Sequence, residues 1–172
     1  GYDFSRRLTD GSTIVCDEDT LTYSLIVPTN DFPSRVFWER VAPALVDTIE
    51  EFTDRDVRVD TVHDSIRMGD KETPADVPEG RQVSGNGLWR HKNAVLCQGI
   101  IPMDSWGENI RYIDMSPEER AEAEDMPYID AKVSEVGDVL LDNIICGDYS
   151  EMSLSSYAET EVDRLTREKY GN

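Results

Sequence analysis

The stretch GRQVSGNGLWRHKNAVLCQGIIPMD, residues 80–104, decides how the middle of this chain folds. Residues 81–84 and 93–102 carry the apolar and β-branched side chains that strands favour. Between them lies the small run Ser84-Gly85-Asn86-Gly87, which is typical of a loop where the backbone comes close to a ligand. We therefore predict two strands separated by a small-residue loop that holds candidate binding residues.

On either side of this stretch, strand and helix patterns are interspersed. Residues 13–15 and 21–27 flank a short acidic turn and predict a hairpin, and residues 57–68 alternate apolar with polar and predict one or two more strands. Residues 69–80 hold two prolines and predict a loop. The pattern as a whole predicts an α+β fold: a mixed, largely antiparallel sheet flanked by helices, in a single domain of residues 1–172.

Four helices are predicted. The first covers residues 34–52, where apolar side chains recur every three or four residues, and Pro43 either kinks it or begins a new turn. Another begins at Ser116-Pro117, a capping serine followed by a proline at the first helical position. The remaining two are predicted near residues 136–146 and 156–169.

The charge balance narrows the range of partners. The chain has 36 acidic and 17 basic residues, a net charge of −19. Such a surface repels nucleic acid, so we expect no nucleic-acid partner. Because the acids are spread from Asp17 to Asp163, they favour a solvated acidic surface, as in proteins of a salt-rich cytoplasm, over a patch made for a basic partner.

Cysteine and histidine positions predict no metal site. The three cysteines, Cys16, Cys97 and Cys146, lack metal-like spacing, and so do His63 and His91. An odd cysteine count without a secretory signal favours the reducing cytoplasm, with Cys97 as a small buried residue. No run of 18 apolar residues exists, so we expect no membrane association.

Several stretches resemble the lipoate-protein ligase family, which shares a fold with biotin ligases and octanoyltransferases. RRLTDGSTIVCDEDTLTYSLIVP, residues 6–28, is similar to the family's paired arginines, glycine triplet, His-Asp and Tyr-Ser strand. Residues 80–104 are similar to its Gly-Arg-Lys-Ile-Ser-Gly-Asn-Ala segment. HDSIR, residues 63–67, resembles its Asn-Asp-Ile strand, and EKYGN, residues 168–172, resembles its usual end.

The resemblance implies that ATP and Mg²⁺ activate lipoate or octanoate as an acyl adenylate, and that the acyl group passes to a lysine of a lipoyl carrier domain. Such chemistry needs cations and backbone N–H groups where negative charge gathers. Arg7 and the loop 9–12 would hold phosphate, Asp64 would face substrate or metal, and Gln82 with residues 84–87 would hold the acyl carbonyl. The implied site residues are Arg7, Thr9, Asp10, Gly11, Ser12, Asp64, Gln82, Ser84, Gly85, Asn86 and Gly87.

The sequence also departs from the family pattern. Gln82 stands where the family carries a lysine, and Gln98 where it carries a histidine. A neutral hydrogen bond contributes about 0.5 to 1.5 kcal/mol, against about 1.5 to 3 for one to a charged group. The alternative is therefore a non-catalytic homologue that binds the acyl group or the carrier. Taken alone, Asp10-Gly11 is an ordinary turn, and Asp64 is equally suited to capping one.

Family members have elements upstream of the paired arginines that this sequence lacks, and many have an accessory domain downstream. We therefore expect an N-terminally incomplete sheet. Its exposed edge would pair with an accessory chain or with a second copy of this chain.

Overall fold

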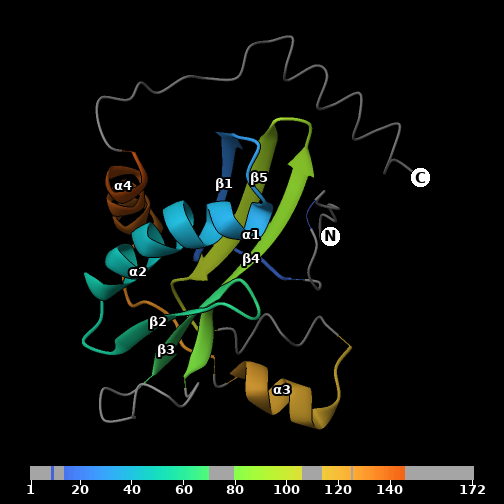
Figure 1. Cartoon of the computed structure of the whole chain (residues 1–172). Coiled ribbons are helices and arrows are strands. Elements are labelled where there is room, and N and C mark those ends of the chain that lie inside the picture. The colour runs from blue at the N-terminus through green and yellow to red at the C-terminus, as the bar shows by residue number, and fades with distance from the viewer. Residues whose placement is uncertain (1–8, 10–13, 70–79, 106–113, 125, 146–172) are drawn as a thin grey trace, which may run out of the picture. The chain divides into compact units, whose positions relative to one another are not determined.

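Five antiparallel strands form one sheet in the computed structural model, in the order β1-β5-β4-β3-β2 (Figure 1). The strands are β1 (Thr20–Pro28), β2 (Asp56–Asp60), β3 (Ser65–Gly69), β4 (Arg81–His91) and β5 (Ala94–Pro102). The structure describes residues 9, 14–69, 80–105, 114–124 and 126–145, within a unit that spans Leu8–Cys146. The predicted α+β class and largely antiparallel sheet are confirmed. A single domain over residues 1–172 stays a prediction.

The strand pairing corrects the predicted hairpin of residues 13–15 and 21–27. Residue 13 lies outside the described residues, and residues 14–15 have no regular structure. β1 pairs instead with β5, from Thr20 opposite Pro102 to Pro28 opposite Ala94. A partner more than 60 residues away leaves no local signal, whereas an acidic turn beside a strand imitates a hairpin.

The predicted small-residue loop is also wrong. Residues 84–87 lie inside β4, which continues to His91 and pairs with β3 on one side and β5 on the other. The tight turn comes later, at Lys92, which has a positive φ of 51°. Glycine weakens an isolated strand, but hydrogen bonds to two neighbours hold these residues extended.

The first predicted helix forms as three consecutive segments, α1 (Pro33–Val36), a π-helical turn η1 (Phe37–Val41) and α2 (Ala42–Glu50). Pro43 has no N–H and its ring crowds the carbonyl of the preceding turn. The wider π turn relieves this, with the Ala42 N–H donating to the Phe37 carbonyl five residues back. α2 thus begins with proline in its first turn, one of the two predicted alternatives.

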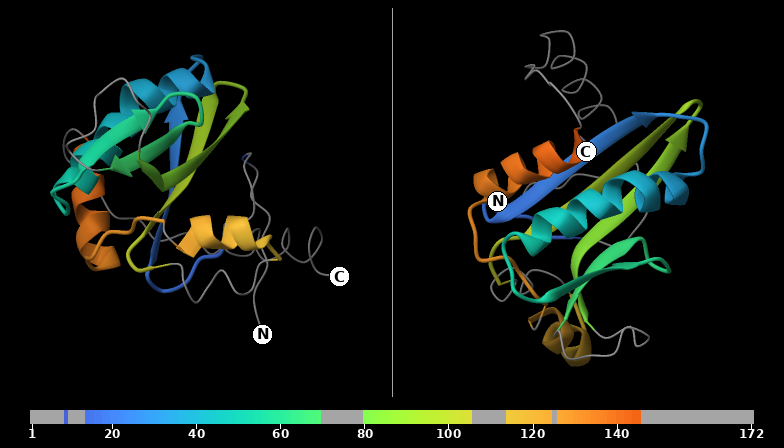
Figure 2. Two further views of the ribbon diagram at one scale, coloured as in Figure 1. Left: turned by 90° about the horizontal axis from the view of Figure 1, so that it is seen from below. Right: turned by 60° about the vertical axis from the view of Figure 1, so that its left-hand side comes forward.

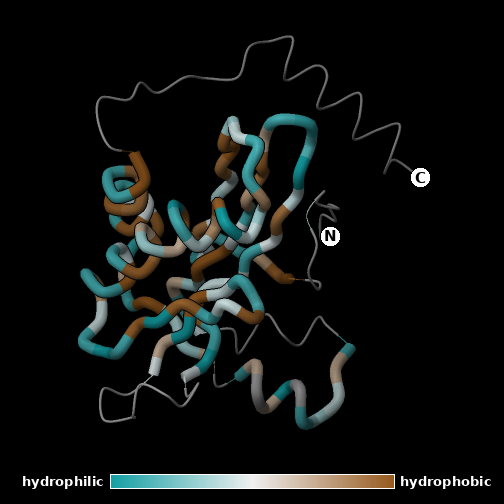
Figure 3. Tube along the Cα trace, in the orientation of Figure 1, coloured by the Kyte–Doolittle hydropathy of each residue, from teal (hydrophilic) through white to brown (hydrophobic). Residues whose placement is uncertain are grey.

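One face of the sheet, here called the inner face, is covered by α1, α2 and α4 (Val133–Ile144), as both views in Figure 2 show. Four members of the predicted apolar repeat are fully buried and form the centre of this core: Phe37, Val41, Leu45 and Ile49. The fifth, Phe52, is partly buried and packs against them. Asn143 of α4 donates to Thr48 Oγ1 of α2 at 3.0 Å, which joins the two helices. In Figure 3 hydrophobic stretches alternate with neutral and hydrophilic ones along the strands, and the β4–β5 turn is hydrophilic.

The other predicted helices have mixed outcomes. α3 (Pro117–Glu124) begins where Ser116-Pro117 predicts, and α4 begins three residues before the predicted 136. The predicted helix over 156–169 and most of the loop 69–80 lie outside the described residues. Within the part of the chain that is described, no helix has the length and hydropathy needed to cross a bilayer.

Candidate active site

The strand register divides the small run of β4 between the two faces of the sheet. Successive side chains on a strand point to opposite faces. Asn86 opposes Gly99, which opposes Tyr23, so Tyr23 and Asn86 share the inner face with the core. Gly87 opposes Gln98 and points to the other face, here called the outer face, as does Gly85. The run therefore presents glycines outward and hydrogen-bonding side chains inward.

The outer face brings Thr9 next to this run. Thr9 is buried, and its Oγ1 donates to Gln98 Oε1 at 3.3 Å. Gln98 Nε2 donates in turn to Ser24 Oγ on β1 at 3.0 Å. Gln98 is the cross-strand partner of Gly87, so Thr9 contacts the residue that lies beside Gly87. The result is a chain of hydrogen-bonded polar side chains next to a glycine position of β4.

A bulge in β4 places Gln82 on the outer face as well. Ser84 opposes Ile66 and Gln82 opposes Arg67, which leaves Val83 as an extra residue. An extra residue shifts the alternation by one, so Gln82 joins Gly85 rather than Ser84. Consistent with this, a side chain at Gly85 would collide with Gln82 Nε2. Gln82 to Gly87 spans on the order of 15 Å of strand.

Ser84 and Asn86 belong to a polar cluster under the helices. The Tyr23 hydroxyl donates to Asn86 Oδ1, and Gly99 leaves the space in which these groups meet. Burial, then the nearby Cys97 thiol, raise the pKa of Tyr23 well above its ordinary value. Asn86 Nδ2 is buried with no hydrogen-bond partner among the described residues. The cluster fixes how β4 lies against β1 and β5.

Asp64 occupies the turn between β2 and β3. Its φ is 47°, a left-handed conformation that aspartate tolerates better than most residues. Together with burial, its charge raises the pKa of Cys97 to about 12. Cys97 points to the inner face, as predicted for a buried thiol. Asp64 therefore lies toward the inner cluster, one residue before Ser65, which opposes Gly85.

The remaining predicted site residues, Arg7, Asp10, Gly11 and Ser12, lie outside the described residues. Of the predicted set, Thr9, Gln82, Gly85 and Gly87 gather on the outer face, while Ser84 and Asn86 face inward and Asp64 lies toward them. Sequence reasoning did not place Ser24, Ser65 or Arg67 in the site. For Ser65 and Arg67, the available signal was their alternation with the apolar Ile66 and Met68.

Among the residues that the structure describes, histidine and acidic groups do not gather as a metal site. His63 Nδ1 lies 2.9 Å from Asp60 Oδ2 on an exposed turn, and His91 stacks on Trp89. In the described residues no three His, Cys, Asp or Glu side chains form a group suited to a metal ion. An Mg²⁺ carried by ATP phosphates needs only one or two protein carboxylates, so it does not require such a group of three.

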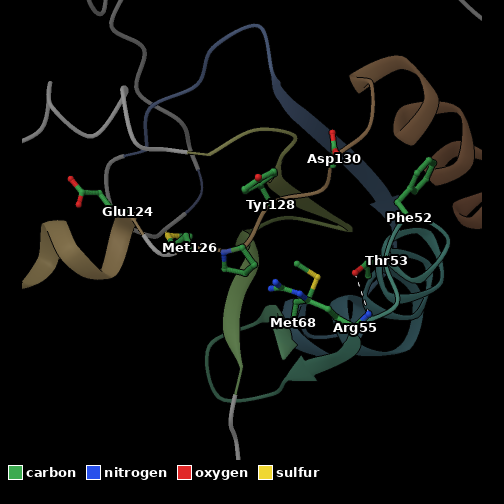
Figure 4. A pocket seen from close by; sticks show the side chains of 9 residues that line it. Phe52, Thr53, Arg55, Met68, Glu124, Met126, Tyr128 and Asp130 are labelled. Atoms are coloured by element: carbon green, nitrogen blue, oxygen red, sulfur yellow. Dashed lines mark hydrogen bonds between the residues drawn. The ribbon is translucent and has the colours of Figure 1, made fainter. Parts of the chain in front are cut away.

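A separate pocket of about 370 Å³ lies beside Met68, near the C-terminal end of β3 (Figure 4). Its walls come from β3 and from the segments after α2 and after α3. Met68 forms one wall, Arg55 and Tyr128 others, and Arg55 N donates to Thr53 Oγ1 at 3.2 Å. Of the predicted site residues that the structure describes, none lines it.

Comparison with known families now bears on this geometry. The model of the lipoyl protein ligase A/B catalytic domain matches residues 1–156. The chain belongs to this family. Its catalytic domain is therefore of the lipoate-protein ligase type, as the resemblance predicts. No curated protein sequence matches.

Solved structures show the same fold. A bipartite lipoate protein ligase of Thermoplasma acidophilum, studied with its E2 lipoyl domain, is 16% identical with a TM-score of 0.75, over 96% of this chain and 67% of that one. A T. acidophilum protein with bound lipoic acid is 16% identical with a TM-score of 0.71, over 96% and 68%. A lipoate-protein ligase A with bound ATP has the same identity, TM-score and coverages.

Proposed function

We propose that this lipoyl ligase domain activates lipoate or octanoate with ATP and transfers the acyl group to a lysine of a lipoyl carrier domain. The observation that carries the proposal is the outer face of β4 and β5. There Gln82, whose amide lies over Gly85, stands at one end of the glycine positions of β4, and Thr9 with Gln98 stands at the other. The family membership of residues 1–156 supports the same reading.

Two steps follow from this proposal. A carboxylate oxygen of the acid attacks the α-phosphorus of ATP, an O–P bond forms, and pyrophosphate leaves. The deprotonated amine of the carrier lysine then attacks the acyl carbonyl, an amide forms, and AMP leaves. Both steps build negative charge on oxygen, so fixed N–H donors in a site from which water is excluded accelerate them.

For this chain we assign positioning roles. Gln82 donates an amide N–H to the acyl carbonyl, and Thr9 and Gln98 orient the polar end of the site. Arg7 and residues 10–12 are proposed for phosphate, and Asp64 for the substrate or its metal. Salt-rich cytoplasm remains the proposed setting, and an accessory chain or a second copy at a sheet edge remains a proposed partner.

The second candidate is a homologue that binds the acyl group or carrier without activating it. Gln82 favours this candidate because a neutral amide supplies no charge to a developing oxyanion. Losing one well-placed donor costs on the order of 10² to 10³ in rate. Both candidate functions include binding of the acid, but only the first includes its activation with ATP.

An assay of pyrophosphate release distinguishes the two candidate functions. The chain is incubated with ATP, Mg²⁺ and lipoate, octanoate or biotin, and binding of each acid is measured in parallel by calorimetry. Pyrophosphate release with lipoate or octanoate, absent with biotin, is the expected result. Binding of an acid without release of pyrophosphate would leave only the second candidate, and no binding of any acid would reject both.

A further inference from the structure

Arg67 lies directly beside Gln82 on the outer face. The two residues are cross-strand partners in β3 and β4. Ser65 and Arg67 alternate with the buried Ile66 and Met68, which puts Arg67 on the same face as Gly85. By register, it is the one Arg or Lys among the described outer-face positions of β1, β3, β4 and β5.

Two contacts fix the Arg67 guanidinium. Nε donates to Asp60 Oδ2 at 2.7 Å, and Nη1 donates to the Gly80 carbonyl at 2.9 Å. The side chain is 29% exposed, so it is partly shielded and still reachable. A guanidinium has five N–H groups in a planar fork, and these two bonds engage two of them. The group is thus held in one orientation with donors to spare for an anion.

A second arginine lies next to Arg67 in the sheet. Arg58 of β2 lies directly opposite it, and like charges at paired positions destabilise a sheet. Asp56 contacts Arg58 and Asp60 contacts Arg67, which offsets part of this repulsion. In a chain with 36 acidic and only 17 basic residues, an arginine beside the glycines of β4 is a candidate for binding negative charge.

From this geometry we propose that Arg67 supplies the positive charge with which the outer face binds the carboxylate of the acyl substrate. The carboxylate lies on the outer face beside the Gln82 amide and the Arg67 guanidinium, which are cross-strand neighbours. Gln82 contributes a neutral hydrogen bond and Arg67 the charged one, which is the stronger of the two. The inference rests on the proposed function, because it names the residue that binds that acid.

The test compares octanoate with its neutral analogue octanamide, by calorimetry on the full chain. Arg67→Gln is expected to weaken octanoate binding about 10- to 100-fold and to leave octanamide binding within about twofold. Adding Gln82→Lys to that variant restores octanoate binding, because the charge returns one strand away. Arg58→Gln is the matched control and leaves both ligands unaffected, since Arg58 lies one strand further from Gln82.

A second variant keeps the test decisive if Arg67→Gln unfolds. Gln82→Glu leaves the contacts of Arg67 with Asp60 and Gly80 in place and puts a carboxylate where the substrate's would lie. It is expected to abolish octanoate binding and spare octanamide. Octanoate affinity unchanged in either folded variant, with the unaltered chain still binding octanoate, would overturn the role of Arg67 alone. No octanoate binding by the unaltered chain would overturn the proposed function too.

Discussion

At the scale of single residues, burial and local charge decide which groups can react. Cys97 is fully buried, and burial followed by the nearby Asp64 charge raises the pKa of its thiol to about 12. At pH 8 about one thiol in ten thousand is then ionised. Cys16, in contrast, is exposed.

We expect a Cys146→Ser variant to show one fast thiol and one protected thiol. With a thiol reagent such as Ellman's reagent at pH 8, Cys16 reacts within minutes in the folded protein, and Cys97 reacts only after denaturation. A Cys16→Ser, Cys146→Ser chain provides the control and should be unreactive until unfolded. Two fast thiols in the first variant would contradict the burial of Cys97.

Asp60 makes acid stability a second residue-scale test. Burial alone would raise its pKa, but hydrogen bonds from His63, Arg67 and the backbone amides of Val62 and His63 outweigh burial and hold the pKa well below its ordinary value. Asp60 therefore stabilises the fold above the unfolded-state pKa of about 4, and this contribution is lost as pH falls toward the folded-state value.

The expected result is a pH-dependent difference between two chains. Asp60→Asn should be less stable than the unaltered chain in urea at pH 7, and the gap should narrow as pH falls below about 4. Asp47→Asn, on the exposed side of α2, serves as control and should change little at either pH. A gap that stays constant down to pH 3 would show that the Asp60 interactions do not depend on its charge.

At the scale of elements, the local repeat of apolar side chains predicts the first helix. The pairing of the strands joins residues far apart in the sequence, so local patterns do not predict it. Spacing alone selects Phe37, Val41, Leu45 and Ile49 as core residues, and all four are buried in the structure. The loop assigned to residues 84–87 fails because two neighbouring strands override glycine's preference. The position of Gln82 could not be inferred, since the extra residue at Val83 is visible only in the pairing with β3.

A substitution at Gly99 tests whether the inner cluster of Tyr23 and Asn86 determines how β1, β5 and β4 pack. A Cβ at Gly99 would collide with the Tyr23 hydroxyl and Asn86 Oδ1. Gly99→Ala should therefore lower the free energy of unfolding by about 1 to 3 kcal/mol, and adding Tyr23→Phe should recover part of the loss. Urea unfolding monitored by circular dichroism measures both.

Gly137 in α4 is the matched control for this prediction. The nearest atom that its Cβ would meet is Leu21 Cδ1 at 3.7 Å, an ordinary contact. Gly137→Ala should leave stability unchanged or raise it by up to about 1 kcal/mol, because alanine favours helix. If Gly99→Ala were as harmless as Gly137→Ala, the close meeting of Tyr23 and Asn86 would be refuted.

At the scale of the whole molecule, charge dominates. A net charge of −19 on 172 residues produces self-repulsion that salt screens. The melting temperature at pH 7 should rise steadily between 0.1 and 1 M KCl. Near pH 4.3, where the net charge vanishes, the same salt series should have a much smaller effect. A salt response equal at both pH values would point to a cause other than charge screening.

The central claim for the whole molecule is that substrate binds the outer face of β4 and β5. The most direct measurement is a backbone amide NMR titration of the full chain with octanoate and ATP. We predict shifts concentrated at Gly85, Gly87 and Gln98, with Thr53 and Tyr128 at the separate pocket unaffected. Shifts centred on that pocket, with the β4 glycines unmoved, would contradict it.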